Sequence, residues 1–185
     1  MTATVPLATL VAHLDRYLDA GAGRDYAPNG LQVEGRSEVG RLVTGVSASE
    51  ELLAQAVARG ADAVLVHHGL FWEGMPRVLT GPMRRKVALL LRHEISLLGY
   101  HLPLDRHPEV GNNAVAARAL GLVDLAPFAL HEGLPTGFSG RFPAPVAATE
   151  LVARCRGLFR QEPLAFLAGP DPLTTVGIVS GGAQR

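Results

Sequence analysis

Apolar residues follow two different periods along this chain, and the changes between them predict an α/β fold. Between residues 7 and 18, apolar side chains recur every three or four positions, which indicates an amphipathic helix. Farther along, three short runs are mostly apolar, and the run at 63–66 is continuously so, as expected of a parallel strand that is buried on both faces. These runs are residues 42–46, 63–66 and 95–100. Helical spacing between the runs predicts two consecutive βαβ crossovers, with the three strands side by side in mixed sheets.

Capping and turn residues mark where the predicted helices begin. Ser47 and Glu50 have the spacing of a capping box, and Pro82 suits the first turn of the next helix. Asn112 is expected to cap a helix over residues 114–120. Helices should therefore follow the first and second strands, and a further helix should follow the third.

The C-terminal third of the chain is less regular and rich in glycine and proline. It predicts a strand at 138–142, a helix at 148–156, and strands at 164–167 and 176–179. Residues 175–180 echo residues 43–47, and the glycine-rich turn after them would normally lead into a helix. We therefore expect two related halves, with an α/β domain at 1–125 and the start of an incomplete second half at 126–185.

Composition narrows the class of protein. The chain has 185 residues, of which 48% are apolar and 18% charged, which indicates a folded protein with a substantial core. Seventeen basic and seventeen acidic residues balance, so no electrostatic footprint for nucleic acid or a membrane surface is expected. A single cysteine, Cys155, excludes a disulfide framework. The absence of a signal peptide and of a membrane-spanning run predicts a cytoplasmic protein.

Metal-ligating residue types stand at the ends of two predicted strands. His67 and His68 follow the run at 63–66 directly, and His101 and Asp105 follow the run at 95–100. Because ligands bind beyond the carboxyl ends of parallel strands, these side chains are expected to share one edge of the sheet. Imidazole nitrogens and a carboxylate together suit zinc, iron or manganese.

Each of these residues has an alternative role. Adjacent strand residues point to opposite faces, so His67 and His68 can share a metal only where the strand breaks, which Gly69 would permit. Asp105 could ligate or bridge metals, or it could be a loop residue in a cap or an ion pair. His101 could be a ligand or a base that handles a metal-bound water. Pro103 argues against a helix over 101–105.

Three segments together resemble one family in order and spacing. They are Asn29-Gly30-Leu31-Gln32-Val33-Glu34-Gly35, Ala61-Asp62-Ala63-Val64-Leu65-Val66-His67-His68, and His101-Leu102-Pro103-Leu104-Asp105 leading into Gly111-Asn112-Asn113. The chain is similar over nearly all its length to the NIF-three-like dinuclear metal centre family, also labelled GTP cyclohydrolase I type 2-like. The resemblance implies an α/β fold of two related halves, a cytoplasmic location, a toroidal homohexamer, and a metal-dependent hydrolase.

The resemblance also implies roles for individual residues. It makes His67, His68 and Asp105 ligands of a centre with two divalent metal ions per subunit, and it places His101 beside that centre. The family draws a further His and Glu from a segment beyond the strand that ends near Val179, and this chain does not contain that segment. The resemblance therefore implies weak or partial metal binding by this chain.

Two classes of function follow from these observations. The first is a metal-dependent hydrolase that acts on a nucleotide or another phosphate-containing small molecule. The second is a non-catalytic, metal-stabilised oligomeric scaffold or regulatory interaction protein. A hydrolase needs open coordination positions and a pocket, whereas a scaffold would have a saturated site.

Overall fold

A computed structural model describes residues 3–182 and divides the chain into two compact units, residues 1–103 and 104–185. The division lies before residue 125, where the sequence analysis separates the two halves. The segment between these points belongs to the second unit because its helix packs there: Ala117 lies in one apolar cluster with Phe142 and Val146. The proposed division into related halves stays a prediction.

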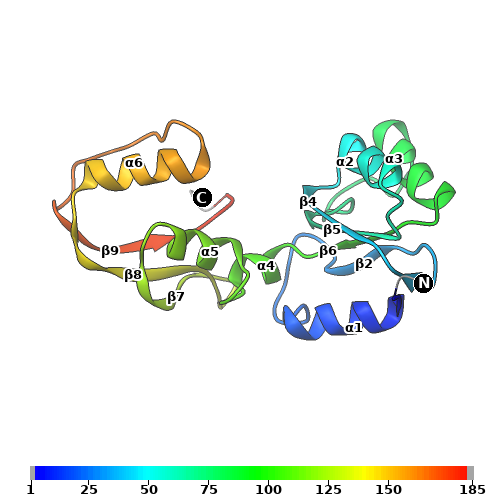
Figure 1. Ribbon diagram of the computed structural model, residues 1–185, viewed down its shortest axis with the longest axis horizontal. Helices are drawn as coiled ribbons and strands as arrows, with labels where there is room; N and C mark the ends of the chain where they lie inside the picture. Colours follow the sequence, from blue (N-terminus) through cyan, green and yellow to red (C-terminus); the bar gives the residue numbers. More distant parts are fainter. Residues whose placement is uncertain (1–2, 183–185) are drawn as a thin grey trace. The chain divides into compact units, whose positions relative to one another are not determined.

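The first unit is a four-stranded mixed sheet between helices (Figure 1). Its strand order is β2-β6-β5-β4, in which β4, β5 and β6 are parallel and β2 is antiparallel to β6. The strands are β2 (Gly30–Val33), β4 (Leu42–Ser47), β5 (Ala63–His68) and β6 (Ser96–Gly99). A two-stranded ribbon pairs β1 (Val5–Pro6) with β3 (Glu38–Val39). The predicted α/β class, the mixed sheet and the two βαβ crossovers are confirmed.

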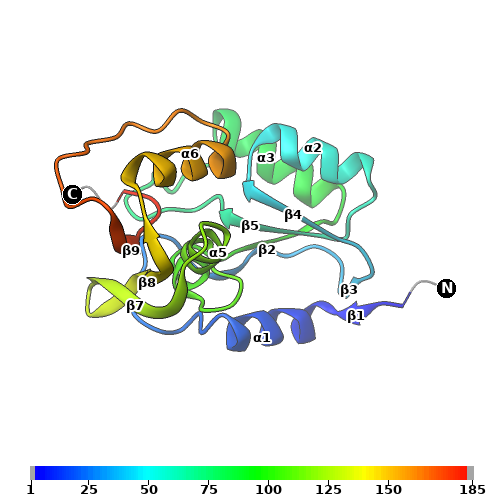
Figure 2. The same ribbon diagram turned by 60° about the vertical axis from the view of Figure 1, so that its left-hand side comes forward.

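Helices cover both faces of this sheet. Figure 2 shows α1 on one side and α2 and α3 together on the other. Their bounds are α1 (Leu7–Tyr17), α2 (Glu50–Ala58) and α3 (Gly81–Arg92). The core between α2, α3 and the sheet includes the fully buried Leu53, Val64 and Leu97. This packing explains why most residues of β5 and β6 are apolar.

The second unit is built on an antiparallel sheet of order β7-β8-β9. Its elements are α5 (Asn112–Ala119), β7 (Val123–His131), β8 (Leu134–Val146), α6 (Ala148–Phe159) and β9 (Leu173–Ile178). The strand expected at 138–142 is part of the longer β8, and the helix expected at 148–156 is α6. The strand predicted at 164–167 is wrong: these residues have no regular structure, and Leu164 and Phe166 are more than four-fifths exposed, at 86% and 84%.

A short helix, α4 (Leu102–Arg106), forms where the sequence analysis argued against one. Pro103 is the second residue of this helix. In the first turn a proline costs no hydrogen bond, because the N–H group that it lacks would have no partner within the helix. A proline disrupts a helix in its interior, so Pro103 excludes a helix only if it lies beyond the first turn.

Two predicted caps are also wrong by one or two positions. Ser49, not Ser47, caps α2, and its hydroxyl accepts a hydrogen bond from the Leu52 N–H at 3.1 Å. Gly111 is the N-cap residue of α5, and Asn112 is the first residue of the helix. Among residues 3–182, no helix combines the length and apolar character needed to cross a membrane.

Candidate metal centre

Three histidines of the first unit meet at the carboxyl end of its parallel strands. One ring nitrogen from each of His67, His68 and His101 lies within 4.8 Å of the others. The ring centroids of His67 and His68 are 4.4 Å apart, and that of His101 is 5.0 Å from His67 and 5.7 Å from His68. All three side chains are partly buried. The structure therefore brings together the predicted ligand pair and the residue that was expected beside it.

The register of the parallel strands explains this convergence. Val66 of β5 pairs with Gly99 of β6. The residues that follow them, His67 and His68 on β5 and His101 after β6, therefore lie at the same end of the sheet. On the other side, His68 pairs with Ser47 at the end of β4. Strand β5 ends at His68 and Gly69 is the first residue after it, so the pair lies where the strand ends, as the sequence predicted.

Hydrogen bonds to Nδ1 determine which nitrogen each imidazole presents. His67 Nδ1 lies 3.1 Å from the Tyr100 carbonyl oxygen, which can only accept, so Nδ1 carries the proton. His101 Nδ1 likewise lies 2.7 Å from Oδ1 of Asp25. Whenever either ring binds a metal as a neutral imidazole, the lone pair that it offers is therefore on Nε2. His68 Nδ1 lies 3.0 Å from the Ser47 hydroxyl, which can take either role.

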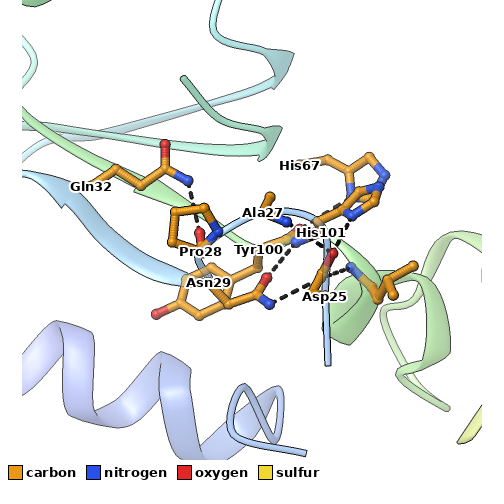
Figure 3. Close-up of polar contacts among 9 residues, drawn as sticks. Asp25, Ala27, Pro28, Asn29, Gln32, His67, Tyr100 and His101 are labelled. Atoms are coloured by element: carbon orange, nitrogen blue, oxygen red, sulfur yellow. Dashed lines mark hydrogen bonds and ion pairs between the residues drawn. The ribbon is translucent and has the colours of Figure 1, made fainter. Parts of the chain in front are cut away.

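Asp25 is the centre of a small network that orients His101 (Figure 3). Besides His101 Nδ1, its carboxylate accepts hydrogen bonds from the Leu102 N–H and from Asn29 Nδ2, both at 2.9 Å. Asn29 in turn accepts a bond from the His101 N–H at 2.8 Å through its side-chain oxygen. The imidazole of His101 is thus held by both its ring and its backbone. A carboxylate behind a histidine also makes that histidine a stronger metal ligand.

The charge on Asp25 is strongly favoured in this network. Burial raises the pKa of Asp25, but its hydrogen-bond donors, first among them His101, lower it more. The pKa therefore falls from 3.8 to about 2. The side chain is only 6% exposed, so a negative charge is kept close to the three imidazoles with little solvent around it. This charge would offset part of the charge of a bound cation.

Gln32 supports the turn that follows the paired histidines. Its side-chain oxygen accepts a bond from the Leu70 N–H at 2.8 Å, and its amide donates to the Pro28 carbonyl at 2.9 Å (Figure 3). A Cβ atom at Gly69 would lie 2.2 Å from that oxygen. Gly69, the first residue after β5, therefore also permits the close approach of Gln32.

Asp105 lies in the second unit and is 5% exposed. Its Oδ1 accepts hydrogen bonds from Asn112 Nδ2 and from the Ser180 hydroxyl, both at 2.8 Å. Ser180 lies two residues after the end of β9, directly before Gly181, and its N–H donates to Asn113 Oδ1 at 2.6 Å. The convergence of Asp105 with the three histidines stays a prediction.

Three residues of this site were not predicted from the sequence, namely Asp25, Ser47 and Trp72. Trp72 packs its ring 5.0 Å from that of His101 and 5.7 Å from that of His68. No motif singled out Asp25, which lies 76 residues before His101. The one available signal was that Asp25 is the single acidic residue of the loop at 20–29, which precedes the turn at Gly30. Glu73, the residue after Trp72, pairs with Arg24 at 2.6 Å.

The donor set of the site fits a transition metal or zinc. It offers three imidazoles, of which two have their lone pair on Nε2, and one buried carboxylate that polarises a ligand. Hard cations such as calcium prefer oxygen ligands and would gain little from this arrangement. The structure supports a metal site formed by histidines, and the identity and number of the ions stay predictions.

Comparisons with known proteins agree with this geometry. A family model described as Duf34/NIF3 (NGG1p interacting factor 3) matches residues 5–185. A GTP cyclohydrolase 1 type 2 homolog of Pseudomonas aeruginosa is 47% identical over 182 residues, which cover 97% of this chain and 71% of that protein. One from Escherichia coli K12 is 43% identical over 172 residues, covering 92% and 68%.

Solved structures show the same relationship. The protein ybgI, of unknown function, matches with a TM-score of 0.88 and 41% identity over 97% of this chain and 71% of its own. A protein from Thermus thermophilus matches with a TM-score of 0.86 and 40% identity over 97% and 72%. The family match spans nearly every residue, including the histidines of the site. The chain belongs to the Duf34/NIF3 family.

Proposed function

We propose that this chain is a metal-dependent hydrolase that acts on a nucleotide or another phosphate-containing small molecule. The observation that carries the proposal is the cluster of His67, His68 and His101, whose ligand atoms lie within 4.8 Å of one another at the carboxyl end of the parallel strands. The name of the curated relatives, GTP cyclohydrolase 1 type 2 homolog, supports a nucleotide as the substrate class.

The residues of the site would divide the work between holding and orienting. His67, His68 and His101 would hold the metal through nitrogen, with Asp105 as a further oxygen ligand. A metal bound there would activate water and stabilise the charge that develops on a leaving oxygen. The Tyr100 carbonyl keeps the proton of His67 on Nδ1, and Asp25 does the same for His101. These contacts arrange the ligands before any ion binds, which reduces the cost of binding.

His101 has two possible roles, and its contact with Asp25 fits both. As a ligand it gains basicity from the carboxylate, and as a base it is oriented by the carboxylate and stabilised when protonated. Metal analysis of His101→Ala separates the roles. If His101 is a ligand, this variant loses metal; if it is a base, the variant keeps metal and loses hydrolysis.

The decisive experiment measures metal content and hydrolysis on the same preparations. Zinc, iron and manganese are determined by mass spectrometry in the wild-type protein and in His68→Ala, with His13→Ala, an exposed histidine on α1, as the matched control. Phosphate release and ring opening are then followed for GTP and GMP, with and without a chelator. The proposal predicts metal in the wild type and the control, less in His68→Ala, and hydrolysis that the chelator abolishes.

A metal-stabilised scaffold is the alternative that this experiment separates. For a scaffold, His68→Ala would lower metal content, thermal stability and assembly while no substrate is turned over. Light scattering on the same samples also tests the expected homohexamer, since a monomer at micromolar concentration contradicts it. Metal-free wild-type protein that stays without metal after incubation with zinc, iron or manganese would refute both functions.

A further inference from the structure

Trp72 is the one tryptophan of the chain, and it lies beside the histidine cluster and not in the core. Its ring is 5.0 Å from that of His101 at an interplanar angle of 77°, and 5.7 Å from that of His68 at 51°. Its neighbour Phe71 packs against the apolar core of the first unit. Phe71 therefore contacts the core, whereas Trp72 borders the histidine cluster.

The loop that carries Trp72 is fastened on both sides of it. Two residues before, the Leu70 N–H donates to Gln32 at 2.8 Å. One residue after, the Glu73 N–H donates to the Tyr26 carbonyl at 2.6 Å, and the Glu73 carboxylate pairs with Arg24 at 2.6 Å. These contacts hold the backbone on either side of the indole in place, so the position of the ring is set before a ligand arrives. A preorganised ring loses little freedom when it takes part in binding.

A partly buried indole next to metal-binding groups offers a flat apolar surface at a fixed distance from the reacting centre. Trp72 is neither fully exposed nor fully buried, so the residue is accessible from solvent. Nucleobases and other planar heterocycles stack on such rings, whereas sugars and phosphates lack a matching π-face. Trp72 can therefore select ligands that carry a planar heterocyclic ring, which the histidines as metal-binding groups do not do.

We propose that Trp72 is a specificity-determining residue that stacks against a planar heterocyclic ring of the substrate. The proposal rests on the proposed function for the chemistry at the histidines, and it narrows the substrate class from phosphate-containing molecules to those that carry a heterocyclic base. Trp72 recognises the base, and the histidine site engages the reacting group.

Intrinsic fluorescence tests this directly because all tryptophan emission comes from Trp72. The probes are GMP, guanosine, which lacks the phosphate, and ribose 5-phosphate, which lacks the base. We expect GMP and guanosine to quench the emission with saturation and ribose 5-phosphate to leave it unchanged. Failure of both guanine compounds to bind the wild-type protein would overturn the proposal.

Calorimetric titration of variants gives the second readout. Trp72→Leu should weaken GMP binding by about tenfold or more, in line with the usual effect of removing a stacking side chain, and leave ribose 5-phosphate binding within about twofold. Trp72→Phe, which keeps a ring, should retain most of the affinity for GMP. Phe166→Leu, at an aromatic residue that is 84% exposed in the second unit, is the matched control and should change neither.

The outcomes separate this proposal from the proposed hydrolase. If Trp72→Leu weakens GMP and ribose 5-phosphate equally and also lowers metal content, Trp72 only supports the histidines and base recognition is wrong. If metal and chelator-sensitive hydrolysis are present but Trp72→Leu leaves GMP affinity unchanged, only the stacking role fails. If base-dependent quenching is present in a protein that neither holds metal nor hydrolyses, the hydrolase fails and the stacking role stands.

Discussion

Replacing Asp25 by asparagine is the sharpest single test of how the site is built. The substitution keeps the size of the side chain and removes one of its two acceptor oxygens. The carboxylate accepts on both oxygens, from His101 Nδ1 at 2.7 Å on one and from the Leu102 N–H and Asn29 Nδ2 at 2.9 Å on the other. An amide has one oxygen and one NH2 group, so it cannot accept on both sides.

Both orientations of the new amide are unfavourable. If its NH2 group faces Leu102 and Asn29, it meets two other donors, the Leu102 N–H and Asn29 Nδ2, and neither hydrogen bond can form. If it faces His101, then Nδ1 must accept, the ring proton moves to Nε2, and the nitrogen that would bind metal loses its lone pair. The second orientation costs the site a ligand without removing the histidine.

The magnitude follows from the same contacts. The pKa of Asp25 falls from 3.8 to about 2, which corresponds to about 2 kcal/mol in favour of the charged carboxylate. Asp25→Asn should therefore lower the free energy of unfolding of the metal-free protein by about 2 kcal/mol at pH 7. Metal affinity should fall by about 10- to 100-fold, the usual effect of losing a carboxylate behind a histidine ligand.

Two measurements check these values. Urea unfolding after chelator treatment gives the stability of the metal-free protein, and competition with a chromophoric chelator gives the metal affinity. Asp19→Asn, at an exposed carboxylate just beyond α1, is the isosteric control and should change neither. A metal affinity of Asp25→Asn within about twofold of the wild type would refute the role assigned to this carboxylate.

Three further predictions concern stability, each measured by urea unfolding. Burial raises the pKa of Asp62, but two backbone N–H groups and a guanidinium lower it below 3.8. The contribution of Asp62 to stability is therefore present above pH 3.8 and is lost as the pH falls through the lowered pKa. Asp62→Asn should lower the free energy of unfolding by about 1 kcal/mol at pH 7 and make stability depend less on pH in acid. Gly69→Ala should cost about 1–3 kcal/mol and weaken metal binding, because a Cβ atom 2.2 Å from the Gln32 oxygen displaces the acceptor of the Leu70 N–H; unchanged stability would contradict this. Gly157→Ala should instead stabilise by about 0.5–1 kcal/mol, since it lies inside α6 with nothing within 4 Å of the added atom, and a loss would show that the helix needs the glycine.

The parallel part of the fold was predictable because its signals are local and strong. The runs at 63–66 and 95–100 are buried on both faces of the sheet, so nearly every residue in them is apolar. Right-handed crossovers then leave one arrangement of neighbouring strands, and that arrangement places His67, His68 and His101 at one edge. Topology alone therefore accounts for the cluster.

The C-terminal part was less predictable because several of its apolar residues are exposed to solvent, so an apolar pattern there does not indicate a buried strand. Residues 164–167 read as a strand, yet Leu164 and Phe166 are 86% and 84% exposed and pair with no strand. Pattern analysis assumes that an apolar run is buried by its own unit. The rule fails where a segment of this unit has no partner layer among the described residues to cover it.

The site shows the same limit in a more instructive form. His67 and His68 can be recognised because two ligand-type residues end one strand, but nothing near Asp25 in the sequence marks it. Its role arises from contacts with residues 76 and 77 positions later, made when the loop before β2 folds over the end of β6. Metal ligands can be recognised from residue type and strand position, whereas the groups that set their tautomers are chosen by tertiary contact. A motif can therefore predict a metal site, whereas we expect the strength of binding to depend on residues such as Asp25 that only the structure identifies.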